Sequence, residues 1–128
     1  MNVGSLQCIL QQHASDIIIA VDRAGTITFW NDGAERLLGF PRARALGARL
    51  DLIIPPHLRE RHWAGFKHAL AAGASLAPAW VKTPVLRADG TITRMAITVL
   101  LLKDGASASG MLAILQDVAP AAARAPQT

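Results

Sequence analysis

Two short turns, each flanked by strand-like runs, constrain the fold of this chain more than any other feature of its sequence. The turns are Asp22-Arg23-Ala24-Gly25 and Ala88-Asp89-Gly90, and the flanking runs are residues 16–21, 26–30, 79–86 and 91–102. Aspartate favours a tight turn because its side chain bonds the nearby backbone, and glycine does so because it tolerates positive φ. The runs are rich in β-branched residues, which favour strands. The chain is therefore predicted to contain two antiparallel hairpins.

Between the hairpins the apolar spacing changes to that of helices. The clearest helix covers residues 58–72, because Pro55-Pro56 breaks the chain before it and Gly73 ends it. A shorter helix begins at Asn31 or Asp32, either of which can cap its first turn. The remaining predicted elements are a short helical or irregular segment over 42–54, a loop over 103–110 and a fifth strand over 111–118.

The order of two strands, helices and then three strands predicts an α+β fold. Strands far apart in the sequence must share one sheet, so we expect a five-stranded antiparallel sheet with helices packed on one face. This domain covers residues 16–118. Apolar residues at helical spacing before it predict a short amphipathic helix over 1–15, and the Ala/Pro-rich segment 119–128 is expected to be a disordered tail.

Composition narrows the class of protein. Apolar residues make up 52% of the 128 residues and charged residues 17%, which is typical of a chain that buries a core. No apolar run approaches the roughly 18 to 20 residues that a membrane-spanning helix needs, and the N-terminus has no secretory signal pattern. One cysteine, Cys8, excludes an internal disulfide. These features predict a cytoplasmic domain that does not bind a membrane.

The charge balance is basic but dispersed. Thirteen Lys and Arg outnumber nine Asp and Glu, for a net charge of +4, and the arginines are spread from Arg23 to Arg124. A phosphate-binding face needs several cations on one element. The sequence therefore predicts no direct contact with nucleic acid.

Several local sequence matches occur in a characteristic order over about residues 10–118. They are the hairpin at 19–27, Trp30-Asn31 followed by Ala34-Glu35-Arg36-Leu37-Leu38-Gly39-Phe40, and the segments 54–62, 86–91 and 114–118. In this order and spacing the chain resembles a PAS domain, the sensory module of histidine kinases, cyclase-type signalling enzymes and transcription regulators. The resemblance implies the PAS fold and a role in signal transduction, including regulation of transcription. It does not name a ligand, because PAS domains bind haem, flavin, metabolites or nothing.

The helix around His62 is similar to that of haem-containing oxygen-sensor PAS proteins, in which the matching histidine is the proximal ligand. This similarity implies His62 as a ligand to haem iron. The sequence departs from those sensors on the third strand, where Val81 stands in register with their gas-side arginine, so oxygen stabilisation by that route is not implied. The Gly-Xaa-Asn-Cys-Arg-Phe-type run of flavin photoreceptor PAS domains is absent, which excludes covalent flavin photochemistry.

The residues themselves leave two interpretations of His62 open. A helical wheel places it on the apolar face of the long helix, with Leu58, Phe66, Ala69 and Leu70. An unpaired polar group there would be costly. The imidazole either bonds to backbone or water inside the core, or it serves as a neutral ligand in an apolar cavity.

The candidate cavity residues, chosen by helix face and strand position, are His62, Phe66, Trp80, Met95 and Ile97. No other chemistry is indicated. The remaining histidines lack the i, i+4 spacing that points two imidazoles at one metal. The chain has no nucleophile elbow, phosphate loop or His-Glu-Xaa-Xaa-His motif, so it is not predicted to be an enzyme.

Two functions follow from this pattern. In the first, a sensory domain encloses haem, bound through His62, or a small apolar metabolite, and occupancy shifts the sheet or the N-terminal helix. In the second, a ligand-free module pairs two copies through the stripe at residues 3–10 and the sheet. A sensor should co-purify with a ligand, whereas a dimerising module should lose self-association in Leu6→Asp or Ile9→Asp.

Both functions are compatible with a homodimer that acts on an effector. The segment after Val118 is a poor coiled coil because it contains prolines. The chain is therefore either a fragment of a protein with a fused effector domain, or it acts on a separate signalling partner in trans.

Overall fold

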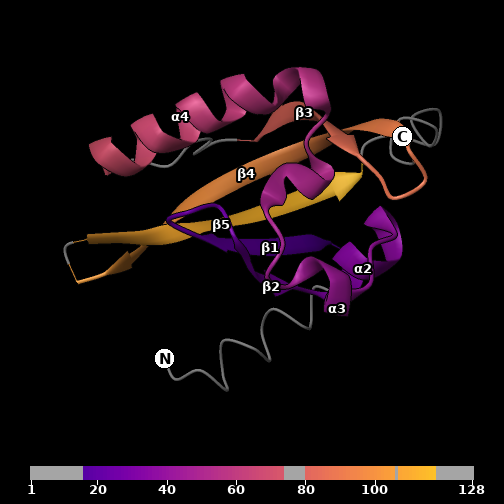
Figure 1. Ribbon diagram of the computed structural model, residues 1–128, viewed down its shortest axis with the longest axis horizontal. Helices are drawn as coiled ribbons and strands as arrows, with labels where there is room; N and C mark the ends of the chain where they lie inside the picture. The colour runs from indigo at the N-terminus through magenta and orange to yellow at the C-terminus, as the bar shows by residue number, and fades with distance from the viewer. Residues whose placement is uncertain (1–15, 74–79, 106, 118–128) are drawn as a thin grey trace.

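A computed structural model describes residues 16–73, 80–105 and 107–117 of the chain, and Figure 1 shows their arrangement. The predicted helix over 1–15 and the predicted tail over 119–128 lie outside the described residues. In chain order the elements are β1 (Ile17–Asp22), β2 (Ile27–Trp30), α2 (Asp32–Leu38), α3 (Arg42–Ala45), the 3₁₀ helices η1 (Leu50–Ile53) and η2 (Pro56–Leu58), α4 (Arg59–Ala72), β3 (Val81–Leu86), β4 (Ile92–Asp104) and β5 (Ser107–Asp117).

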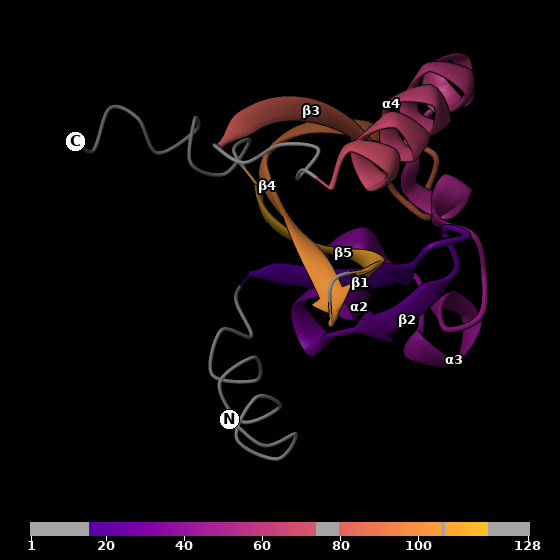
Figure 2. The same cartoon turned by 90° about the vertical axis from the view of Figure 1, so that its left-hand side faces the viewer.

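The strands form one five-stranded sheet in the order β2-β1-β5-β4-β3. Every neighbouring pair is antiparallel. The last strand, β5, lies in the centre and joins the N-terminal hairpin to the C-terminal one. Figure 2 shows that the sheet is strongly curved, with β3 and α4 at one end and β1, β2 and α2 at the other. The predicted α+β class with a five-stranded antiparallel sheet is confirmed.

One face of the sheet carries the core. Alternate residues of β1, β4 and β5 point to this face, because side chains alternate along a strand. They meet apolar residues from the helices in a single cluster. Its members include Ile17, Ile19, Val21, Met95, Val99, Met111 and Leu115 from the strands, and Ala34, Leu38, Ala45, Phe66 and Ala69 from the helices. The helices therefore pack on one face of the sheet, as predicted.

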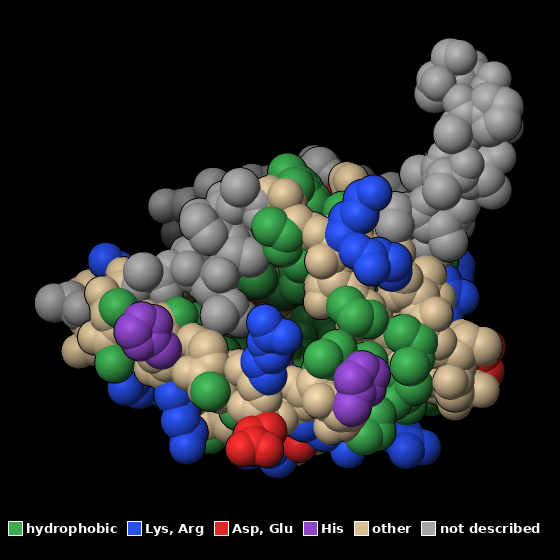
Figure 3. Space-filling view, turned by 90° about the horizontal axis from the view of Figure 1, so that it is seen from above, with side chains coloured by type: hydrophobic (Ala, Val, Ile, Leu, Met, Phe, Trp, Pro, Cys, Tyr) green, Lys and Arg blue, Asp and Glu red, His purple; other side chains and the backbone are tan. Residues whose placement is uncertain are grey.

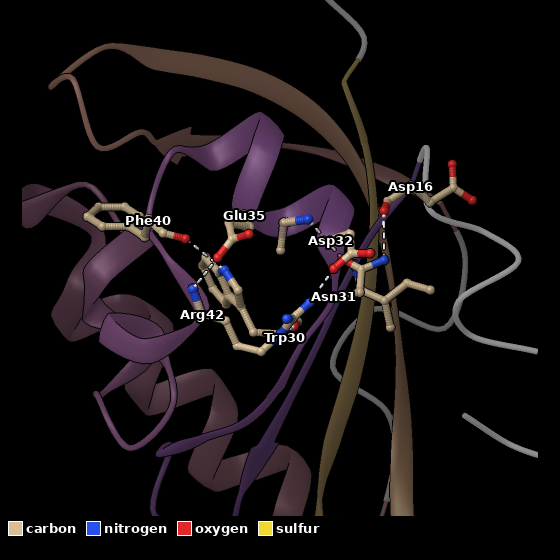
Figure 4. Close-up of polar contacts among 9 residues, drawn as sticks. Asp16, Trp30, Asn31, Asp32, Glu35, Phe40 and Arg42 are labelled. Atoms are coloured by element: carbon tan, nitrogen blue, oxygen red, sulfur yellow. Dashed lines mark hydrogen bonds and ion pairs between the residues drawn. The ribbon is translucent and has the colours of Figure 1, made fainter. Parts of the chain in front are cut away.

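Asn31 ties β1 to the start of α2. Its Oδ1 accepts the backbone N–H of Ile18 at 3.0 Å and that of Ala34 at 2.9 Å, and its Nδ2 donates to the carbonyl of Asp16 at 2.9 Å (Figure 4). The residue is 3% exposed, so these bonds satisfy an amide that would be costly to bury alone. Of the two predicted capping residues, Asn31 is the N-cap.

Helix α4 follows the predicted wheel. Phe66 and Ala69 are buried, His62 is half-buried, and Lys67 is exposed. The helix ends at Gly73, whose φ of 69° is left-handed and whose N–H donates to carbonyls of the last turn. No helix in the described part of the chain combines the length and the apolar character needed to cross a membrane.

The last hairpin is longer than predicted. The sequence pattern placed a loop over 103–110, whereas β4 continues to Asp104 and β5 begins at Ser107. Small residues in this stretch pair with β4, with Leu102 opposite Gly110 and Lys103 opposite Ala108, and the register shifts between these two pairs. Glycine, serine and alanine favour loops or helices by propensity, but here pairing with β4 and β1 decides the outcome. The third strand begins at Val81.

Candidate functional site

A cavity of about 280 Å³ lies between α4 and the curved sheet. Its lining comes from six elements: Ile19, Val21, Leu50, His62, Phe66, Val81, Lys82, Thr83, Ile97, Val99, Met111 and Ala113. Figure 3, the view from above, shows a hollow with hydrophobic side chains inside it and Lys or Arg side chains beside it. Most of the lining is apolar, which is typical of a small-molecule site.

Strand register explains why the sheet leaves a hollow at this place. Ala113 on the central strand β5 lies opposite Ile19 on one side and Val99 on the other. Because the methyl group of Ala113 is shorter than the branched side chains on either side of it, the surface of the sheet is lower in the middle of this row. Phe66 of α4 closes the space from the opposite side. The cavity therefore results from one small residue in the centre of an otherwise large-residue face.

His62 is the polar group in the wall contributed by α4. Its Nδ1 is buried and has no hydrogen-bond partner among the described residues. Burial lowers the pKa of His62 from its ordinary value, and the nearby Asp51 carboxylate opposes this effect. The neutral imidazole is consequently favoured, in which one nitrogen can donate a hydrogen bond and the other can accept one.

Aromatic neighbours hold the imidazole in place. The His62 ring centroid lies 6.2 Å from that of Phe66 in a stacked arrangement and 4.6 Å from that of Trp63 edge to face. An unpaired buried nitrogen costs free energy. A hydrogen-bonding ligand or a metal that reached this nitrogen from the cavity would satisfy it.

Three of the five predicted site residues come together in this cavity. His62 and Phe66 project from α4, and Ile97 projects from β4. Lys82 is the one lining residue with a permanent charge. It lies next to Val81, which is 48% exposed and is paired with Ile97 in the sheet.

The other two predicted residues lie outside the lining. Met95 is on the same face of β4 as Ile97, but it lies two residues nearer the start of the strand, opposite Thr83, where it is fully buried in the core. Trp80 precedes β3 and is 50% exposed. The prediction placed Trp80 at the opening of a strand over 79–86, whereas the first paired residue of this edge strand is Val81.

Several lining residues were not predicted. Alternation along β4 from Ile97 could have identified Val99, since residues two apart share a face. Met111 and Ala113 required the knowledge that β5 is the central strand. Leu50 comes from η1, whose position follows from no local pattern.

Comparisons with known proteins agree with this architecture. A family model described as the PAS fold matches residues 8–118. A relative from Azorhizobium caulinodans, described as an uncharacterized protein, is 36% identical over 86 residues, which is 66% of this chain and 12% of that protein. The chain thus spans about 12% of the length of that relative.

Two solved structures show the same fold. The PAS domain of a protein from Colwellia psychrerythraea has a TM-score of 0.76 at 20% identity, covering 91% of this chain and 97% of that chain. The PAS domain of the quorum-sensing receptor RpfR from Cronobacter turicensis, in complex with C12:0, has a TM-score of 0.67 at 15% identity, covering 81% and 94%. With the family model covering most of its length, this chain belongs to the PAS domain family, the sensory modules of signal transduction.

Proposed function

We propose that this domain senses a small organic ligand bound in the cavity between α4 and the sheet, with His62 as its polar partner. The observation that carries the proposal is the buried, unpartnered Nδ1 of His62 in the wall of an apolar cavity. A protein gains nothing for its own stability from such an atom. A ligand that supplies a hydrogen bond there removes the penalty and is recognised by doing so.

Size and charge indicate the class of ligand. The cavity, at about 280 Å³, is just below the range of roughly 300 to 1,000 Å³ that is usual for small-molecule sites. Lys82 provides a cation for an acidic group. A molecule with a short apolar body and one acidic or polar group fits both features. The RpfR PAS domain was solved in complex with C12:0.

Haem is the alternative occupant. The donor chemistry fits, since a neutral imidazole in apolar surroundings is a suitable axial ligand. The present volume is small for a porphyrin, so the α4 side would have to move away from the sheet. When bound, haem would supply a redox- and gas-sensitive iron, and His62 would hold it.

Occupancy would be passed on through the sheet. The lining includes residues of β1, β4 and β5, so a ligand that fills the space above Ala113 presses on the strands from one side. Because packed interiors are dense and poorly compressible, the strands would shift rather than absorb the change. The recipient is an effector domain or a separate partner.

A cavity-blocking substitution tests this proposal. Ala113→Phe places a ring in the hollow, and we expect the wild type, but not the variant, to co-purify with a small molecule detected by mass spectrometry after denaturation. The protein is expressed with ample haem, and its absorbance spectrum is recorded as well. A Soret band that is lost in His62→Ala would identify haem as the occupant; without a Soret band, the extracted molecule identifies the ligand class.

Two variants control for damage to the fold. Ala96→Phe adds the same ring to the opposite face of β4 and should retain the bound molecule. His68→Ala removes an exposed imidazole from the same helix and should leave absorbance unchanged. Equal amounts of the same molecule from wild type and Ala113→Phe would contradict binding in this cavity.

A second candidate function is self-association through the outer face of the sheet. Residues that alternate with the cavity lining form largely apolar rows there, with Leu112 between Ala20 and Leu100 and Ile114 between Ile18 and Thr98. Leu100 is 46% exposed. A sheet whose two faces are both apolar needs a cover on the second face, and we propose a second copy of this chain as that cover.

An acidic residue in the outer face should disrupt the dimer. We expect Leu100→Asp to raise the dimer dissociation constant at least about tenfold, because a carboxylate would be buried without a partner. Light scattering after size-exclusion chromatography measures the change. Leu46→Asp is the matched control, since Leu46 is 42% exposed elsewhere on the domain and should not alter the mass. Equal masses for all three proteins at every concentration would contradict this interface.

A further inference from the structure

A second hollow, distinct from the cavity, lies beside α4 at the β1–β2 turn. It has a volume of about 400 Å³ and is lined by Arg23, Ala24, Arg49, Trp63, Phe66 and Lys67. We call this set the cationic groove. Three of the six residues carry a permanent positive charge, and none of the six is acidic. Trp63 and Lys67 reach it together because they are four residues apart on one helix.

The two arginines of the groove are held in place by the fold. The Arg23 guanidinium donates to the carbonyl of Ala108, near the start of β5. Arg49 donates to the carbonyl of Ala24 at 3.1 Å, and its guanidinium carbon lies 4.7 Å from the centroid of a Trp63 ring. These arginines therefore do not pay the full entropy of ordering when they bind a ligand. Each guanidinium has further donors beyond the bonds named.

The carboxylate of Asp51 contacts the cationic groove but does not neutralise its positive charge. Asp51 accepts the Trp63 Nε1–H at 2.5 Å through Oδ1, and its Oδ2 lies 3.6 Å from Arg49 Nε. Asp51 thus fixes the indole and offsets one charge of three. Lys67 has no ion-pair partner among the described residues. The groove keeps an excess of positive charge that an anion can complement.

The indole is locked against the β1–β2 turn. Gly25 has a φ of 85°, and a Cβ at this position would lie 2.3 Å from the Trp63 ring. The Phe66 ring contacts Trp63 edge to face, with centroids 5.1 Å apart. The groove therefore combines a fixed indole with two fixed guanidinium groups, an arrangement that suits a flat organic anion better than a bare inorganic ion.

We propose that the cationic groove binds a small organic anion with a planar ring and a phosphate or carboxylate group. The ring would lie against Trp63 and Phe66, and the anionic group would receive hydrogen bonds from Arg23, Arg49 and Lys67. This inference does not rest on the proposed ligand of the cavity. Phe66 lines both sites, so both contact the same helix.

Calorimetric titration at low ionic strength tests the proposal with 5′-GMP and benzoate as the two anionic probes. Guanosine is the matched probe that lacks the charge, and inorganic phosphate is the matched probe that lacks the ring. We expect at least one anionic probe to bind and the matched probes to bind at least about tenfold more weakly. The tighter of GMP and benzoate identifies the preferred anionic group.

Variants then locate the site. Arg23→Gln and Lys67→Gln should each weaken binding about fivefold, and the double variant about 25-fold if the effects add. Arg61→Gln removes an exposed charge from the same helix outside the groove and should change affinity less than twofold, as expected for general surface charge. Thermal unfolding confirms that each variant is folded.

Three results would overturn the proposal: guanosine binding as tightly as GMP, Arg61→Gln weakening binding as much as Lys67→Gln, or no saturable binding of either anionic probe at millimolar concentration. Inorganic phosphate binding as tightly as GMP would overturn the role of the ring. Binding that persists in Ala113→Phe places the probe outside the cavity, so the two sites are tested separately.

Discussion

Asn31→Leu is expected to lower the free energy of unfolding by about 3 kcal/mol, since it leaves buried backbone groups without partners. Leucine is close to asparagine in size but accepts and donates nothing. The N–H of Ile18 and that of Ala34 would lose their acceptor, and the carbonyl of Asp16 would lose its donor. The helix cap would be lost at the same time. Urea unfolding followed by circular dichroism measures the change through the midpoint.

Two further variants separate the buried network from a general effect at this turn. Asn31→Asp keeps both acceptor bonds but turns an oxygen toward the Asp16 carbonyl, so we expect a smaller loss than for leucine. Asp32→Ala breaks only the exposed ion pair with Arg42 and should cost less than about 1 kcal/mol. If Asn31→Leu were no more destabilising than Asp32→Ala, the amide would not be the tie between β1 and α2.

The hairpin turns could be predicted because their chemistry is local. The Asp22 side chain accepts from the N–H groups of Ala24 and Thr26, at 2.9 and 3.0 Å. Asp89 accepts from the N–H of Thr91 in the same way. Bonds between residues two to four apart are visible in a short stretch of sequence. The same applies to the end of α4 at Gly73.

The choice of Asn31 over Asp32 as the cap could not be predicted, because it depends on β1. Either side chain can accept from the first turn of a helix. Only asparagine has, in addition, an amide that donates to a strand on the far side of the turn. The position of that strand is set by tertiary structure and cannot be seen in the local sequence.

The candidate site likewise has features that could be predicted from the sequence and features that could not. Helical periodicity identified His62 and Phe66, and the resemblance to haem sensors drew attention to the same imidazole. The hollow itself depends on Ala113, which is small and ordinary in the sequence. Its effect becomes clear only once β5 is known to lie between β1 and β4, because Ala113 then stands between Ile19 and Val99. Trp80 and Met95 lie outside the lining, because Trp80 precedes the first paired residue of β3 and Met95 stands at a position of β4 that is buried in the core.

Gly110→Ala should be the most damaging small substitution in the sheet. A Cβ at this position would lie 2.0 Å from the carbonyl oxygen of Val21 and 3.0 Å from the Cα of Asp22. Both are backbone atoms of β1, so relief requires that β1 and β5 separate where Asp22 pairs with Gly110. We expect a loss of about 3 kcal/mol in the free energy of unfolding, at the upper end for overpacking, or no cooperative transition at all.

Gly105→Ala is the control that separates steric contact from backbone strain. Gly105 has a φ of 68°, which alanine adopts only with strain, but nothing lies within 4 Å of its added Cβ. Gly110 has no such φ, so its cost comes from contact alone. Strain of this kind costs roughly 1 to 2 kcal/mol; urea unfolding should therefore rank Gly110→Ala as the more destabilising of the two. The reverse order would mean that β1 and β5 can move apart easily. The cavity walls that these strands provide would then be too compliant to pass a ligand's presence to the rest of the sheet.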